Sequence, residues 1–370
     1  MKRLLRHGYT TGACAAAAAK GAALLLRDQR PVDEVEIVLP RGEPATFHLQ
    51  GQEFAAERAA CFVVKDAGDD PDVTNGAEIH AAVTLTSAPS PGEREPVVVI
   101  EGGEGIGRVT KPGLAVPPGE WAINPVPRRM ITDALHEVFP NPQFPITIHC
   151  LLCIPNGAAL ARKTLNARLG IIGGLSILGT TGIVKPISAK AWTDTLDAAL
   201  DVAVACGCTS VVLSTGRSSE LVAQKYLGTG DWGLGTGKGL QEEAFVMMGD
   251  HVAYALQACA RRGVRTVVLA GQFAKLLKVA CGHGQTHVAA SSLELESLVR
   301  WVESEMQDQE LASIVREANT ARQVLEESGN AAPLAALVGR RARDTARQLA
   351  PAVEVKVLVA GYRGEVLYFR

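Results

Sequence analysis

Hydrophobic positions in the first half of the chain fall into short blocks of unequal length. Residues 13–27 form an Ala- and Leu-rich block just after Thr10 and Thr11, which predicts a helix with a threonine N-cap. Short β-favouring runs, separated by Gly, Pro and Asp, predict strands at residues 35–39, 58–65, 79–86, 96–101 and 146–154. A second helix is predicted at residues 127–139. This irregular order indicates an α+β domain with a mixed or antiparallel sheet.

The second half of the chain alternates more regularly. Its pattern predicts helices at residues 190–206 and 250–262, strands at 210–214 and 265–270, three helices within 291–349, and a closing hairpin of residues 353–360 and 365–369. The two inner strands are almost continuously apolar, which is typical of strands covered on both faces. We therefore predict two domains, an N-terminal α+β domain over residues 1–187 and a C-terminal Rossmann-like α/β domain with a largely parallel sheet over residues 188–370.

Composition narrows the class of protein. Lys and Arg number 37 and Asp and Glu number 39, so the formal charge is −2, which excludes a protein that binds nucleic acid through an extensive basic surface. Eight cysteines scattered along the chain fit a reducing, cytoplasmic setting better than a disulfide scaffold. No uncharged run approaches the roughly 18 residues of a membrane helix. We expect a soluble, unprocessed protein without a nucleic-acid or membrane partner, and the sequence leaves a homo-oligomer open.

The densest group of acidic residues lies at residues 65–76, which we call the carboxylate turn. Asp66, Asp69, Asp70 and Asp72 follow a predicted strand within this short segment. Three interpretations compete: a divalent-cation site, a site for a positively charged ligand group, and a turn in which Asp side chains accept hydrogen bonds from backbone amides. Taken alone, these residues favour the structural turn.

Two segments are unusually rich in glycine. Residues 166–184, the glycine-rich segment, match neither a P-loop nor a G-x-G-x-x-G fingerprint, so a hairpin and a ligand loop both stay open. A second stretch, residues 102–113, carries Arg108 and Lys111 and leads to Arg128 and Arg129. Cations displayed on such loops suit an anionic ligand, although solvated surface charge is the simpler interpretation for any one of them.

Other candidate residues have simpler interpretations. Cys150 and Cys153 resemble half of a zinc site, but they project to opposite faces of an extended strand, so we expect no metal there. Asp250 stands just before an apolar-periodic helix, which favours an N-cap. Cys14 falls in the first turn of the first helix, where its thiol could be acidified or simply buried.

Several long motifs, in order, resemble one family. They are YTTGACAAAAAK (residues 9–20), KDAGDDPDVTNG (65–76), GIGRVTKPGL (105–114), AINPVPRRMI (122–131), NARLGIIGGLSILGTTGIV (166–184) and VLAGQFAKLLK (268–278). Together they resemble the cobalt-precorrin-5B C1-methyltransferases, the CbiD family of anaerobic cobalamin biosynthesis. The resemblance extends from Arg6 to about His287, and little of it reaches beyond Ser291.

The resemblance implies an enzyme that methylates carbon 1 of cobalt-precorrin-5B to give cobalt-precorrin-6A. It implies S-adenosylmethionine as methyl donor and a cobalt-containing tetrapyrrole as small-molecule acceptor, with cobalt present only as part of the substrate and no metal required by the protein. The family commonly has His-Thr-His-Ser where this chain has Gln285, Thr286, His287 and Val288. That departure leaves a second interpretation, a non-catalytic corrinoid-binding or carrier protein.

Site residues follow as hypotheses from this resemblance and from residue chemistry. For the donor's cationic groups we predict Thr10, Thr11, Asp69, Asp70, Asp72, Gly173, Gly174, Ser176, Gly179, Thr180, Thr181 and Gly182. For the acceptor's carboxylates we predict Arg108, Lys111, Arg128, Arg129, Arg168, Lys185 and Lys275. Asp66 and His287 are the predicted catalytic residues. Methyl transfer from a sulfonium disperses positive charge, so alignment and exclusion of water should matter most.

Overall fold

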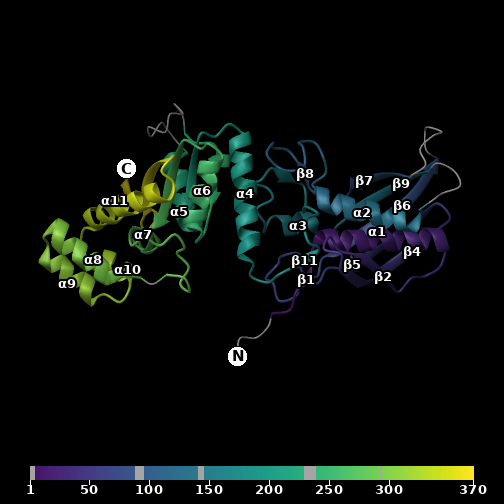
Figure 1. The fold of residues 1–370 in the computed structure, drawn as a ribbon, viewed down its shortest axis with the longest axis horizontal. Coiled ribbons are helices and arrows are strands. Elements are labelled where there is room, and N and C mark those ends of the chain that lie inside the picture. The colour runs from purple at the N-terminus through teal and green to yellow at the C-terminus, as the bar shows by residue number, and fades with distance from the viewer. Residues whose placement is uncertain (1–4, 88–95, 141–145, 229–238, 292) are drawn as a thin grey trace. The chain divides into compact units, whose positions relative to one another are not determined.

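The computed structural model describes residues 5–87, 96–140, 146–228, 239–291 and 293–370. The chain forms two compact units that divide between Ala189 and Lys190 (Figure 1). Both contain helices and sheets, so the fold is mixed α/β. None of the described helices combines the length and apolar character that a bilayer crossing would require.

The first unit is built on a five-stranded sheet in the order β4-β5-β6-β9-β7. Its strands are β4 (Gln50–Phe54), β5 (Arg58–Val64), β6 (Glu78–Ser87), β9 (Ile146–Cys153) and β7 (Val97–Gly102). Neighbouring strands are antiparallel except β7 and β9, which are parallel. The helices α1 (Thr11–Asp28) and α2 (Pro125–Val138) pack against each other, and α1 also packs on β5 and β6. The predicted mixture of helices and mostly antiparallel strands is therefore present.

Helix α1 is surrounded by protein on nearly all sides. Its alanines from Ala13 to Ala19 are at most 1% exposed, because they have no bulky side chain to hold α2 and the sheet apart. A Cβ atom at Gly21 would lie 2.5 Å from Cδ1 of Leu49, so the glycine also serves close packing. An Ala-rich sequence thus forms the central helix of this unit, and its small side chains explain why it fits there.

Three small two-stranded pairings complete the first unit. They are β2 (Glu34–Val38) with β3 (Pro44–His48), β1 (Gly8–Tyr9) with β11 (Ile183–Val184), and β8 (Arg108–Val109) with β10 (Ile171–Ile172). A short helix, α3 (Gly157–Ala161), precedes β10 in the chain. Two of these pairings use the ends of the glycine-rich segment. The segment is therefore attached at one end to the start of the chain and at the other to the second glycine-rich stretch.

The second unit contains a sheet in the order β13-β12-β14-β15-β16, parallel except for β16. Its strands are β12 (Ser210–Ser214), β13 (Phe245–Met247), β14 (Thr266–Gln272), β15 (Glu354–Ala360) and β16 (Val366–Phe369). The main helices are α4 (Ala189–Ala205), α5 (Arg217–Leu227), α6 (Val252–Arg261), α7 (Phe273–Ala280) and α11 (Ala331–Leu349). Helix α5 covers one face, whereas α6, α7 and α11 contribute to the core on the other.

The helical stretch before β15 differs from its prediction. Among its described residues, four α-helices replace the predicted three: α8 (Leu295–Trp301), α9 (Gln309–Glu317), α10 (Ala321–Glu327) and α11. A π-helical turn, Val302–Met306, and the left-handed residue Gln307 separate α8 from α9. A short 3₁₀ turn, Glu242–Ala244, precedes β13. Hydrophobic periodicity alone does not reveal such a break, because the apolar face continues through it.

Candidate functional site

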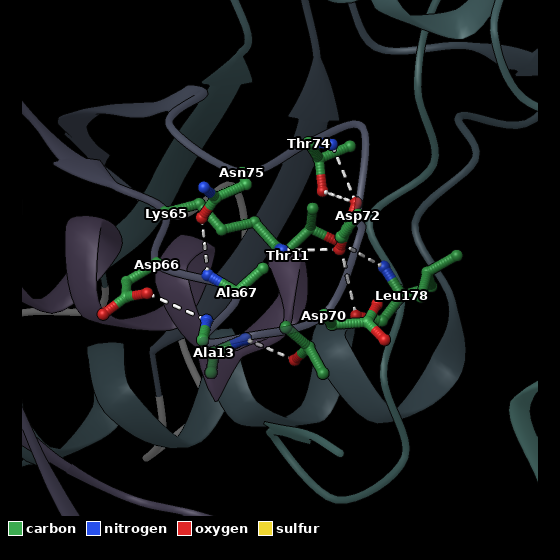
Figure 2. A network of polar contacts seen from close by, with 12 residues as sticks. Thr11, Ala13, Lys65, Asp66, Ala67, Asp70, Asp72, Thr74, Asn75 and Leu178 are labelled. Carbon is green, nitrogen blue, oxygen red and sulfur yellow. Dashed lines mark hydrogen bonds and ion pairs between the residues drawn. The ribbon is translucent and has the colours of Figure 1, made fainter. Parts of the chain in front are cut away.

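The glycine-rich segment folds over the N-terminus of α1. Thr10 caps the helix by accepting a hydrogen bond from the Ala13 amide at 3.2 Å, and its own amide donates to the Gly182 carbonyl at 2.9 Å. The Thr11 hydroxyl accepts from the Leu178 amide at 3.0 Å, and the Gly12 amide donates to the Leu178 carbonyl at 3.0 Å (Figure 2). The predicted donor residues Thr10 and Thr11 therefore lie against this segment.

Close backbone approach explains one of the glycines. Gly179 has a φ of +128°, and a Cβ atom there would lie 2.4 Å from the Thr10 hydroxyl oxygen. A larger residue would displace the cap of α1. The other predicted donor residues of this segment, Gly173, Gly174, Ser176, Thr180, Thr181 and Gly182, also lie between β10 and β11.

The carboxylate turn contacts the residues that directly precede α1. The Tyr9 amide donates to the Asp66 carbonyl at 2.7 Å, and the Arg6 amide donates to the Asp69 carboxylate at 2.8 Å. The Arg6 guanidinium forms an exposed ion pair with the Asp66 carboxylate, and this contact lowers the pKa of Asp66. The predicted catalytic residue Asp66 is thus held by the start of the chain.

A buried ion pair organises the interior of the turn. Lys65 is 1% exposed, and its ammonium lies 2.7 Å from the Asp72 carboxylate. The other Asp72 oxygen accepts from the Thr74 amide at 2.7 Å and from its hydroxyl at 2.6 Å (Figure 2). Burial alone would raise the pKa of Asp72, but the hydrogen bonds from Lys65 and Thr74 lower it. Asp70 accepts from the Ile187 amide at 2.9 Å.

All four carboxylates of the turn therefore have partners within the chain. These contacts are those expected of the structural turn, in which Asp side chains accept from backbone amides and from nearby cations. They leave the proposed contact with the donor as a prediction.

The predicted acceptor residues of the first unit occupy several loops. Arg108 donates to the Gly119 carbonyl at 2.6 Å and lies over the Trp121 ring, with its guanidinium carbon 3.9 Å from the ring centroid. Arg128 donates to the Ile123 carbonyl at 3.0 Å, so part of its donor capacity supports the backbone. Lys111 lies by the Arg168 carbonyl at 3.5 Å, Lys185 is exposed just after β11, and Arg129 is exposed on α2.

A cavity of about 480 Å³ lies beside α1 and α2. Ala16 of α1, residues 37–40, Thr180 and Arg129 are among its lining groups, together with carboxylates of α2 such as Asp133. It brings together one predicted donor residue, Thr180, and one predicted acceptor residue, Arg129. The lining combines apolar side chains with one cation, Arg129, and two carboxylates, Asp133 and Glu137.

The second unit holds a separate polar cluster where β13 and β14 end. Asp250 accepts from the Lys275 ammonium and, at 2.6 Å, from the Thr286 hydroxyl. The buried Lys278 ammonium donates to the Thr286 carbonyl at 3.1 Å and to the Ser291 carbonyl at 3.0 Å. Burial and the charge of Lys275 lower the pKa of Lys278. The predicted acceptor residue Lys275 is therefore already paired with a carboxylate.

Asp250 belongs to this cluster, and His287 follows Thr286 in the chain. The prediction that Asp250 caps a helix is wrong: His251 occupies the N-cap of α6, and Asp250 turns to Lys275 and Thr286 instead. The predicted catalytic residue His287 is exposed, and its Nδ1 accepts from the Ala289 amide at 3.2 Å. Gln285, which replaces the family's first histidine, lies 3.3 Å from Nδ1 of His251.

The cysteines are free where the structure describes them, and most carry raised pKa values. Cys14 is fully buried in α1, and burial raises the pKa of its thiol to about 12, so it is not acidified. Cys150 is buried in the core of the first unit, where burial likewise raises its pKa to about 12. Within the described ranges, no three His, Cys, Asp or Glu side chains are grouped so that they could hold a metal ion.

Comparison with known families shows to which family the chain belongs. Residues 1–186 match the family described as CbiD, and residues 285–369 match the family described as CbiD, C-terminal domain. The chain belongs to the CbiD family. The second match covers α8 to β16, a region in which the sequence motifs carried little of the resemblance.

Curated CbiD relatives align over the whole chain. A protein named cobalt-precorrin-5B C(1)-methyltransferase from Geobacter metallireducens is 65% identical over 365 residues, which are 99% of this chain and 98% of that protein. A protein of the same name from Geobacter sulfurreducens is 63% identical over 367 residues, covering 99% of each. A solved structure described as cobalamin biosynthesis protein (cbiD) from Archaeoglobus fulgidus has 28% identity and a TM-score of 0.39, covering 74% of this chain and 79% of that one.

Sequence reasoning missed several residues of these clusters. The sequence motifs indicate no role for Arg6 and Lys65, which form ion pairs with Asp66 and Asp72 of the turn. They also indicate no role for Lys278 and Thr286, which form hydrogen bonds near Asp250. One signal was available for Lys278: it is three positions from Lys275 on an otherwise apolar helix, so the two ammonium groups had to share one side of α7.

Proposed function

We propose that this chain catalyses methylation of carbon 1 of cobalt-precorrin-5B, giving cobalt-precorrin-6A in anaerobic cobalamin biosynthesis. The observation that supports this most strongly is the end-to-end likeness to relatives of that name, at 65% identity over 99% of the chain. Because an alignment of this length includes both units, the proposal concerns the whole chain rather than one motif.

We propose S-adenosylmethionine as the methyl donor, which the CbiD resemblance implies. In the transfer a C–C bond forms at carbon 1, the bond between sulfur and the methyl carbon breaks, and its electron pair stays on the sulfur of S-adenosylhomocysteine. The chain's task is to align the two reactants and to exclude water. The tetrapyrrole's cobalt belongs to the substrate in this proposal.

The acceptor's carboxylates suit the cationic loops of the first unit. We propose Arg129 as the leading contact, because it is exposed and lines the 480 Å³ cavity. Lys185 is exposed as well and follows β11 directly. Arg108 and Arg128 have backbone partners, so they would bind carboxylates with their remaining donors. Lys111, Arg168 and Lys275 stay in the predicted set.

The donor contact predicted for the carboxylate turn has a direct test. Asp70→Asn removes one charge but keeps an oxygen that can accept from the Ile187 amide, so folding should be preserved. If the turn holds the donor's cationic groups, calorimetric affinity for S-adenosylmethionine, which carries both the sulfonium and the ammonium charge, should fall. Unchanged affinity in a folded variant would remove the turn from the donor site.

We also propose that residues 190–370 form a Rossmann-like domain. The support is a parallel sheet in the order β13-β12-β14-β15, with α5 on one face and α6, α7 and α11 on the other. The antiparallel strand β16 at its edge is a common addition to such sheets.

The function is tested by anaerobic incubation of the purified chain with S-adenosylmethionine and cobalt-precorrin-5B. An enzyme releases S-adenosylhomocysteine in proportion to methylated product. A corrinoid carrier, the alternative suggested by Gln285, would bind the tetrapyrrole and release none. That second result would overturn the proposal.

A further inference from the structure

Chain connections in the parallel sheet of the second unit reverse direction at one place. From β12 the chain passes through α5 to β13 on one side, and then through α6 to β14 on the other side of β12. Helix α5 packs on one face of the sheet and α6 on the opposite face. In open α/β sheets, loops that leave two such strands diverge and form a ligand crevice beyond their carboxyl ends. Here those strands are β12 and β14.

The loop after β12 leaves room at the start of α5. Gly216 is the N-cap of this helix and supplies no capping side chain. A Cβ atom built on it would meet nothing within 4 Å. The position beside Gly216 is therefore open, and the helix dipole favours an anionic group there, although the buried residue Glu220 already places a carboxyl group in the same turn.

A buried hydroxyl stands two residues before Gly216 in the chain. Ser214, the last residue of β12, is 0% exposed, and its Oγ atom forms no hydrogen bond with the residues that the structure describes. Since side chains alternate along a strand, Ser214 lies on the same face as Val212, which packs in the core under α5. Burying a hydroxyl without a hydrogen-bond partner is unfavourable, so this one points independently to a polar partner near the start of α5.

The loop after β13 presents a carboxylate to the same edge of the sheet. Oδ1 of Asp250 accepts from Lys275 and Thr286, whereas Oδ2 accepts no hydrogen bond from the described residues. The Asp250 side chain is 24% exposed, so a ligand can reach it. An acidic side chain after the second strand of such a sheet is well placed to accept from ribose hydroxyls.

We propose that this carboxyl edge, formed by Ser214, Gly216 and Asp250, binds the S-adenosyl compound that donates the methyl group. Its amino-acid carboxylate lies at the start of α5, and Asp250 accepts from its ribose. The inference rests on the proposed function, which supplies such a donor. It assigns the donor to the second unit rather than to the carboxylate turn.

The substitution Gly216→Asp tests the carboxylate position. Gly216 has an extended backbone that any residue adopts, and aspartate is a favourable N-cap, so the variant should fold with an unchanged or higher unfolding temperature. Its new carboxylate occupies the proposed anion position. We expect the calorimetric Kd for S-adenosylhomocysteine to rise about tenfold or more.

Asn330→Asp is the matched control. Asn330 caps α11, which follows α10 rather than a strand, and this variant adds the same charge at the same kind of position. Its Kd for S-adenosylhomocysteine should equal that of the parent chain. An equal loss of affinity in both variants would mean that net charge, not the proposed site, is responsible, and would overturn the inference.

Asp250→Asn tests the ribose contact by a ratio of affinities. The parent chain should prefer S-adenosylhomocysteine over its 2′-deoxyadenosyl analogue, and the variant should lose most of that preference. Parental affinity in Gly216→Asp, or an unchanged preference in Asp250→Asn, overturns the site while methylation by the parent chain still supports the proposed function. A parent chain that neither binds S-adenosylhomocysteine nor forms it overturns both.

Discussion

At the scale of single residues, Lys65 and Asp72 show how unequal the two halves of an ion pair are. The Lys65 side chain is 1% exposed, whereas the Asp72 side chain is 23% exposed. A charge left without its partner costs most where water cannot reach it. The carboxylate turn therefore depends on Asp72 more strongly than on Lys65.

We predict that Asp72→Asn destabilises the chain more than Lys65→Met does. Asp72→Asn leaves a buried ammonium without its counter-charge and should cost about 3–5 kcal/mol, whereas Lys65→Met leaves a carboxylate that water can reach and should cost less. Urea unfolding of both variants measures the difference. The double variant should be more stable than Asp72→Asn alone, and the reverse order of the two single variants would contradict this account.

The pKa of Asp72 also sets a pH dependence. Its folded pKa is lowered by Lys65 and Thr74, below an unfolded value of about 3.9. Its contribution to stability is therefore complete above about pH 4 and is lost as the pH falls through the folded pKa. Unfolding free energies measured between about pH 5 and pH 2 should fall less steeply in Asp72→Asn than in the parent chain. Identical slopes would contradict the assignment.

At the scale of elements, contacts at the start of α1 join this helix to the glycine-rich segment. The cap residue Thr10 bonds the first turn of the helix and the Gly182 carbonyl, and Gly179 packs against its side chain. One residue thus fixes both the helix and the loop that covers it.

We predict that Thr10→Ala lowers the unfolding free energy by about 1 kcal/mol, the usual cost of an N-cap hydroxyl. Thr10→Ser keeps the hydroxyl and should recover most of the loss. Chemical denaturation compares the two variants. An Ala variant as stable as the Ser variant would show that the cap does not hold α1.

Secondary structure was predictable where a run of residues is apolar and its members all favour the same kind of element. The strand at residues 210–214 and the helix at residues 13–27 belong to this class, and both are present as β12 and α1. Strands β3 and β4 were not predicted. In β4 every residue is exposed or half-exposed, so no apolar alternation marks it, and only its pairing with β5 makes it a strand.

At the scale of the whole molecule, net charge does not explain how an anionic substrate is attracted. The net charge of −2 cannot attract an acceptor that carries several carboxylates. Attraction then depends on how cations are distributed, and Arg129 at the cavity of the first unit is the clearest example.

We predict that Arg129→Gln raises KM for cobalt-precorrin-5B about threefold to tenfold with a smaller effect on kcat, because one charged contact to a carboxylate is lost. Rising ionic strength should weaken acceptor binding in the parent chain more than in this variant. Steady-state kinetics at low and high salt measure both effects. Arg30→Gln, an exposed residue of the same unit, is the matched control and should change neither KM nor its salt dependence.

The sequence by itself determined the family, the order of most helices and strands, and the segments in which chemistry should lie. It could do so because long motifs and hydrophobic periodicity are local properties of the chain. Only the tertiary structure decided which charges have partners: Arg6 meets Asp66, Lys65 meets Asp72, and Asp250 meets Thr286 rather than capping α6. The exposure of a charge and its distance from other groups arise from contacts between distant residues, and no local pattern encodes them.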